Sequence, residues 1–74
     1  MAEEVFEDSH HLVFQNAFID NEQREQAVGM TRGLLVVAVV FVDRSEPGAE
    51  IVRIISARKA DRYEQNLYQD QRFA

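Results

Sequence analysis

The feature that most restricts the fold of this chain is an unbroken apolar segment, Leu34–Val42, in which five of the nine residues are valine. A helix on a protein surface would show polar residues at a 3.6-residue period, and helices seldom place β-branched residues in series. A helix that spans a membrane needs roughly twenty apolar residues, which is about twice this length. We therefore predict a β-strand that is buried on both faces.

Shorter patterns on both sides of this segment predict further strands between two helices. The predicted elements are the end of a helix over Ala2–Asp8, strands over His11–Ile19, Arg24–Thr31 and Ile51–Ile55, and a helix from Ala57 onward. Turn residues separate them at Asp20–Glu22, Arg32–Gly33 and Asp43–Ala49. In the first strand, Leu12, Phe14 and Phe18 are separated by even numbers of residues, which predicts a common face. The order predicts an α+β fold, an antiparallel sheet of three to four strands with a short N-terminal helix and a C-terminal helix.

Size and composition limit the class of protein. Seventy-four residues form one domain, 1–74, and a chain this short buries only about 60% of its unfolded surface. Nothing before Asp8 resembles a signal peptide, and the absence of cysteine fits a reducing cytosol. We expect a soluble, cytoplasmic protein with no membrane contact. Its net charge of −5 disfavours general binding to nucleic acid, yet four of its eight basic residues fall between Arg53 and Arg62.

That basic segment lies where the last predicted strand meets the last predicted helix. Ser56 is the candidate N-cap of the helix. Arg58 and Lys59 follow at the corner, and Arg62 is four residues beyond Arg58, so a helix would present both arginines on one face. Arg53 alternates with Ile51 and Ile55 and is expected on the opposite face from Val52 and Ile54.

Two interpretations of the basic segment follow from its residue types. Arginine clusters suit phosphate, because the planar guanidinium donates paired hydrogen bonds and stays charged. Basic residues at such a corner also commonly pair with nearby carboxylates, here Asp61 or Glu64, and only solvate the surface.

A resemblance to a known family bears on this choice. The segment 53–60, Arg-Ile-Ile-Ser-Ala-Arg-Lys-Ala, followed by Glu64 and Tyr68, resembles the C-terminal signature of the BrnT toxins. Segment 33–37 resembles their central strand, and Arg24 together with segment 28–31 resembles the strand before it. Segment 3–8 resembles the end of their second helical segment. The resemblance covers nearly the whole chain.

The resemblance implies a RelE-like ribonuclease toxin of a type II toxin–antitoxin system. Its partners would be an RNA substrate and a cognate BrnA-like antitoxin of the ribbon-helix-helix class. Carried over by position, the catalytic residues would be Arg24, Arg53 and Arg58, with Lys59 and Arg62 as RNA-binding residues. The reaction would need no metal and no cofactor: a ribose 2′-hydroxyl attacks the adjacent phosphate, and Lys59 or Glu64 supplies the final proton.

The family pattern is not matched everywhere. BrnT proteins open with a further strand and helix, which this chain lacks, so we expect an uncovered apolar sheet face and a homodimer or higher oligomer that buries it. His10 and His11 are neighbours whose side chains point apart in a strand or loop, which disfavours a shared metal. Two alternatives stay open: an inactive family member that still binds an antitoxin or oligomerises, and an unrelated small oligomerising domain.

Overall fold

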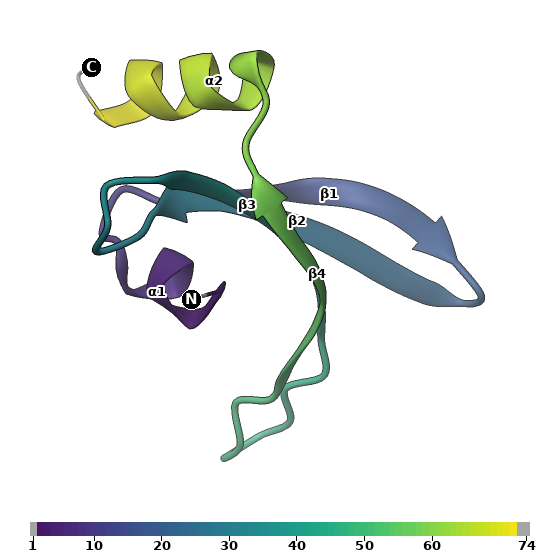
Figure 1. The fold of residues 1–74 in the computed structure, drawn as a ribbon. Helices are drawn as coiled ribbons and strands as arrows, with labels where there is room; N and C mark the ends of the chain where they lie inside the picture. The colour runs from purple at the N-terminus through teal and green to yellow at the C-terminus, as the bar shows by residue number, and fades with distance from the viewer. Residues whose placement is uncertain (1, 73–74) are drawn as a thin grey trace.

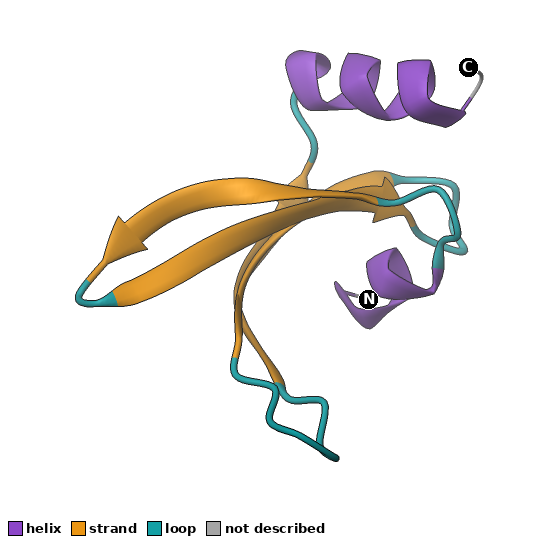
Figure 2. Ribbon diagram, turned by 180° about the vertical axis from the view of Figure 1, so that it is seen from behind, coloured by secondary structure: helices purple, strands orange, loops and turns teal. Residues whose placement is uncertain are grey.

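The computed structural model describes residues 2–72, which form a four-stranded antiparallel sheet with one helix on each side. The elements are α1 (Ala2–Glu7), β1 (Leu12–Ile19), β2 (Glu22–Met30), β3 (Val36–Asp43), β4 (Val52–Lys59) and α2 (Arg62–Arg72). The strands pair in the order of the sequence, and α1 and α2 lie on opposite sides of the sheet (Figures 1 and 2). The α+β class with short terminal helices is confirmed.

Alternate residues of β3 face two small cores. The core on the α1 side of the sheet, called here the α1 face, consists of Val5, Ala27, Val37, Val39 and Phe41. The core on the other side, the α2 face, consists of Val28, Ala38, Ala60 and Tyr68. The prediction of a strand buried on both faces is confirmed for the body of β3. Its first two predicted residues, Leu34 and Leu35, lie in the preceding turn and are exposed.

A β-bulge in β1 changes which residues share a face. The register passes from Gln15 opposite Glu25 to Ala17 opposite Arg24, so Asn16 is an extra residue. Phe14 consequently packs on the α2 face, whereas Phe18 lies on the α1 face and is 67% exposed. The prediction that Phe14 and Phe18 share a face was wrong, because the extra residue reverses the alternation beyond it.

The last strand is longer than predicted and the last helix begins later. Ser56 pairs with Val40, and the next two residues continue the ladder, so this segment is strand and Ser56 caps no helix. The N-cap is Asp61: its Oδ1 accepts from the Glu64 backbone N–H at 2.8 Å, and Glu64 Oε1 accepts from the Asp61 N–H at 2.9 Å. This reciprocal pair is a capping box. The predictions of a helix from Ala57 and of a common helix face for Arg58 and Arg62 were wrong.

The sheet opens into two diverging hairpins. Asp20 and Asn21 have φ values of 51° and 62°, as the tight turn of the β1–β2 hairpin requires. Pairing between β2 and β3 ends at Glu25 and Phe41. Beyond that point the β1–β2 hairpin runs one way and the β3–β4 hairpin another (Figure 1). Arg44 and Arg53 of the second hairpin both contact Glu22 of the first.

Candidate functional site

The three arginines predicted to act on phosphate lie on one face of the sheet. Arg58 pairs with Ala38, a member of the core on the α2 face. Arg53 pairs with Val42, four residues further along β3 and therefore on the same side. Arg24 comes two residues before Gln26, whose partner Val40 is also on that side. The three side chains thus start from the α2 face of the sheet.

A second β-bulge makes this possible. The register of β4 passes from Ser56 opposite Val40 to Ile54 opposite Phe41, which leaves Ile55 as an extra residue. Arg53 and Arg58 are five positions apart and would point to opposite faces in a regular strand. The extra residue restores a common face.

Arg58 is held by a buried carboxylate at the start of α2. Its two terminal nitrogens donate to the two oxygens of Glu64 at 2.7 and 2.9 Å. Glu64 is only 5% exposed and also accepts from Gln26 Nε2 on β2 and from the backbone of Asp61. The hydrogen bonds from Arg58 lower the pKa of Glu64 most strongly, with burial opposing them. The predicted pairing of a corner arginine with Glu64 is therefore present, and it fastens α2 to the sheet.

A second group of charges sits where the two hairpins separate. We call Glu22, Arg24, Arg44 and Arg53 the junction cluster. Arg44 Nη2 donates to Glu22 Oε2 at 2.6 Å, and Arg53 Nη2 donates to Glu22 Oε1 at 3.2 Å. The Nε of Arg24 is buried and has no hydrogen-bond partner within the part of the chain that the structure describes. The pKa of Glu22 is lowered, chiefly by the hydrogen bond from Arg44 and also by the charges of Arg53 and Arg24.

The two residues predicted to bind RNA lie apart from that face. Lys59 pairs with Val37, a member of the core on the α1 face, so it points away from the side that carries Arg58. Arg62 is the first residue of α2 and is exposed. The structure thus brings Arg24, Arg53 and Arg58 to one face without Lys59.

Neither histidine has the surroundings of a catalytic base. His11 has its Nδ1 2.7 Å from the backbone oxygen of Asp8, and its ring stacks edge-on against Phe6. His10 is exposed beside Ser9 and Asp8. Among residues 2–72, no group of three or more histidine or acidic side chains is close enough to hold a metal ion. None of the helices described in that range is long and apolar enough to cross a membrane.

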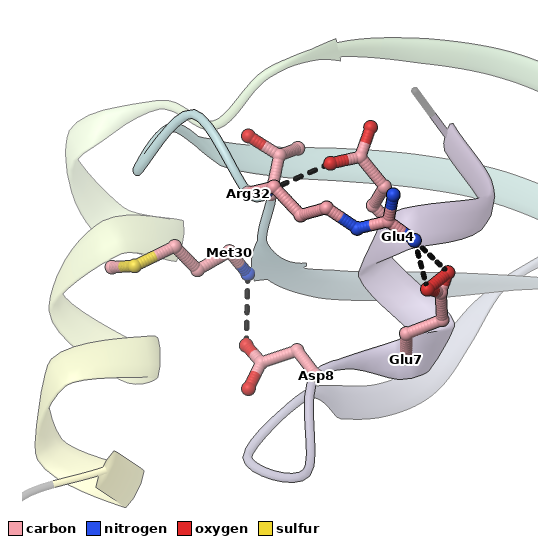
Figure 3. A pocket seen from close by; sticks show the side chains of 6 residues that line it. Glu4, Glu7, Asp8, Met30 and Arg32 are labelled. Atoms are coloured by element: carbon pink, nitrogen blue, oxygen red, sulfur yellow. Dashed lines mark hydrogen bonds and ion pairs between the residues drawn. The ribbon is translucent and has the colours of Figure 1, made fainter.

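An acidic hollow lies elsewhere, between the end of α1 and the end of β2. It has a volume of about 370 Å³ and is lined by Glu4, Glu7, Asp8, Met30, Thr31 and Arg32. Glu7 accepts from the guanidinium of Arg32 at 2.6 Å, and Asp8 accepts from the Met30 backbone at 2.9 Å (Figure 3). Three carboxylates against one arginine make this cleft unfavourable for phosphate.

Sequence reasoning missed two members of the junction cluster. Arg44 was placed in a loop and Glu22 in a turn, and neither was assigned a role. The sequence alone could have linked Glu22 to Arg24, since residues two apart in one strand share a face. Nothing in the sequence pattern indicated that Arg44 would reach across from the other hairpin.

Residues 1–64 match the model of a family described as "Ribonuclease toxin, BrnT, of type II toxin-antitoxin system". The matched range contains all three arginines of the α2 face and ends at Glu64, so Tyr68 lies beyond it. A search of the curated proteins found no match.

Proposed function

This chain belongs to the BrnT family of ribonuclease toxins of type II toxin–antitoxin systems, and we propose that it cleaves RNA without a metal ion, using Arg24, Arg53 and Arg58 to stabilise the phosphate. We also propose a RelE-like mode of action in the cytoplasm. The observation that carries the proposal is the common face of these three arginines, which depends on the bulge at Ile55.

The proposed reaction is a transesterification within the RNA. The 2′-hydroxyl of one nucleotide attacks the adjacent phosphorus, and the bond to the 5′-oxygen of the next nucleotide breaks. Negative charge accumulates on the phosphate oxygens in the transition state, where guanidinium groups are effective donors. The 2′-hydroxyl gives up its proton to water as it attacks, and the leaving oxygen must receive a proton in turn.

The structure bears on the source of that proton. Arginine is a poor donor because its pKa stays above about 12. The pKa of Glu64 is lowered by Arg58, so Glu64 is ionised at neutral pH and cannot donate a proton there. Of the two candidates, Lys59 is the one that we propose. It lies on the edge strand β4, from which a long side chain can reach RNA around the sheet edge, with Arg62 contacting a flanking phosphate.

A second candidate function is favoured by the ion pairs themselves. Arg58 is bound by Glu64, and Arg53 by Glu22. If these carboxylates stay in place, two of the three arginines are neutralised, and the chain would act as an inactive module that binds an antitoxin or oligomerises.

Membership of a type II toxin family implies an antitoxin partner. We propose a BrnA-like protein of the ribbon-helix-helix class, as the resemblance implies. We also propose a homodimer or higher oligomer, because the six-residue helix α1 covers the α1 face only in part. Val13 and Phe18 on β1 and Val52 and Ile54 on β4 start from that face and are 37–67% exposed. A light-scattering mass equal to one chain at micromolar concentration would contradict the oligomer.

The nuclease proposal is tested with purified protein and single-stranded RNA in the presence of EDTA. The wild type should cleave, leaving 2′,3′-cyclic phosphate ends, and Arg53→Gln should reduce the cleavage rate by about 100- to 1,000-fold, the range found when one transition-state donor is removed. Arg32→Gln is the matched control, since Arg32 is also an exposed arginine bound to a glutamate. Absence of cleavage, together with normal growth on expression, would refute the nuclease and favour the inactive module.

A further inference from the structure

The junction cluster has the composition of an anion site that already holds an anion. Three arginines surround one carboxylate, so the cluster has a net charge of +2 within a chain of net charge −5. Arg44 donates a terminal nitrogen to Oε2 of Glu22, and Arg53 donates one to both Glu22 oxygens, closer to Oε1. The phosphodiester of RNA has two non-bridging oxygens that share a negative charge, as a carboxylate has, and would engage the same donors.

Two of these arginines retain capacity for a further acceptor. Arg24 has a buried Nε with no partner among the described residues, although its charge contributes to the field at Glu22. A buried donor without an acceptor is uncommon and calls for an explanation. Arg53 contacts Glu22 through Nη2 alone, at 3.2 and 3.4 Å, which are long for a charge-assisted hydrogen bond. Both groups could therefore donate to a further acceptor.

The carboxylate is also easy to displace. The side chain of Glu22 is 27% exposed, and those of Arg44 and Arg53 are each 51% exposed. Exposed ion pairs add little to stability, so exchanging Glu22 for another anion costs little folding energy. The Arg58–Glu64 pair differs: Glu64 is buried, caps α2 and binds Gln26, so it is a fixed part of the fold.

From these observations we propose that the junction cluster is a phosphate-binding site for RNA formed by Arg24, Arg44 and Arg53, and that Glu22 is an internal competitor that occupies it in the free protein. The inference rests on the proposed function for the identity of the ligand. It adds Arg44 as a binding residue and assigns Glu22 an inhibitory role. It also separates the two arginine sites: Arg53 exchanges its carboxylate for phosphate, whereas Arg58 contacts phosphate while it is still bound to Glu64.

The test measures binding of a short 2′-O-methyl oligoribonucleotide, which cannot be cleaved by 2′-hydroxyl attack, by fluorescence anisotropy at several salt concentrations. Glu22→Gln removes the competing charge at nearly constant shape and should tighten binding by about 5- to 10-fold, as expected for one additional charged contact. The slope of log affinity against log salt should steepen by about 0.7, the value for one further phosphate contact on a single strand. Arg44→Gln should weaken binding and reduce that slope.

Glu25→Gln is the matched control. Glu25 lies on the same strand but pairs with Phe41, so it starts from the opposite face, and the substitution changes the net charge equally. Equal tightening by Glu22→Gln and Glu25→Gln would show that the effect comes from the change in net charge alone, and would overturn the proposal. Unchanged binding in Arg44→Gln, with thermal melting showing an intact fold, would overturn it as well.

Cleavage of unmodified RNA, measured in parallel, distinguishes this inference from the proposed function. If the wild type cleaves RNA but Glu22→Gln binds no more tightly than Glu25→Gln, the nuclease stands and the competitor role of Glu22 is refuted. If no variant cleaves but the binding changes follow the expected pattern, the phosphate site stands and the nuclease is refuted.

Discussion

Replacing Glu64 by glutamine is the most informative single change for the fold, because it alters one atom in a buried carboxylate that joins β2, β4 and α2. Four hydrogen bonds reach Glu64 from Arg58, Gln26 and the Asp61 backbone. Glutamine keeps only one acceptor oxygen and presents an NH₂ group in place of the other. At least one arm of Arg58 and one neutral donor therefore lose their acceptor.

The cost follows from how well water can replace each lost contact. A neutral buried donor left without an acceptor costs about 1–2 kcal/mol. The lost arm of Arg58 costs less than a fully buried charge would, about 1 kcal/mol, because that side chain is 53% exposed. The sum is about 2–3 kcal/mol, which for a domain of this size lowers the melting temperature by roughly 10–20 °C.

The assay is thermal melting followed by circular dichroism, with Glu46→Gln as a control at an exposed glutamate with the same charge change. The pKa of folded Glu64 is below its ordinary value of 4.5. Its stabilisation is consequently complete above about pH 5 and is lost as the pH falls through the folded-state pKa. The difference in melting temperature between wild type and Glu64→Gln should be largest at pH 7 and shrink toward pH 3. Equal melting temperatures at pH 7, or a difference that does not change with pH, would refute the reasoning.

Three further substitutions test other contacts by thermal melting. Tyr68→Phe removes the hydroxyl that donates to Asp8, and should cost about 1–2 kcal/mol; an unchanged melting temperature would contradict that role. Gly29→Ala places a methyl group 3.0 Å from both the side chain and the backbone oxygen of Val5, and should cost about 1–3 kcal/mol by pushing α1 off the sheet; a gain in stability would show that α1 moves freely. Asp61→Ala removes the N-cap of α2 and should cost about 1 kcal/mol, visible as a loss of helical signal before the main transition.

The sequence predicts the strands of the sheet better than it predicts the face on which each side chain lies. Five valines in nine residues leave little alternative to a buried strand, and β3 confirms this. The bulges at Asn16 and Ile55 escape such reasoning, because a bulge is defined by the partner strand and not by its own residues. Each bulge moves every later side chain to the other face, so the common face of Arg53 and Arg58 could not be found by counting residues along β4.

The start of α2 shows a different limit. Ala60, Tyr63 and Leu67 recur at helical spacing, and with Ser56 as the candidate N-cap this favoured a helix from Ala57 onward. Pairing with β3 outweighs that preference, since Arg58 and its neighbours complete the ladder on that strand. The sequence did contain the correct signal, an Asp61-x-x-Glu64 capping pattern that marks Asp61 as the N-cap. Pairing of Glu22 with Arg44 across two hairpins depends on the twist of the sheet, which no local pattern encodes.

The strictly sequential strand order has a consequence for how the chain assembles. Every ladder joins strands adjacent in the sequence, so the sheet can form through a series of short loop closures, which are rapid. Docking of the two helices, by contrast, requires distant segments; for α2 these are 38 residues apart for Gln26 and Glu64 and 60 apart for Asp8 and Tyr68. Both contacts end on a carboxylate whose pKa is lowered. Mild acid should therefore release α2 while the sheet persists, and in native-state hydrogen exchange the amides of α2 would exchange through this local opening before those of β2 and β3.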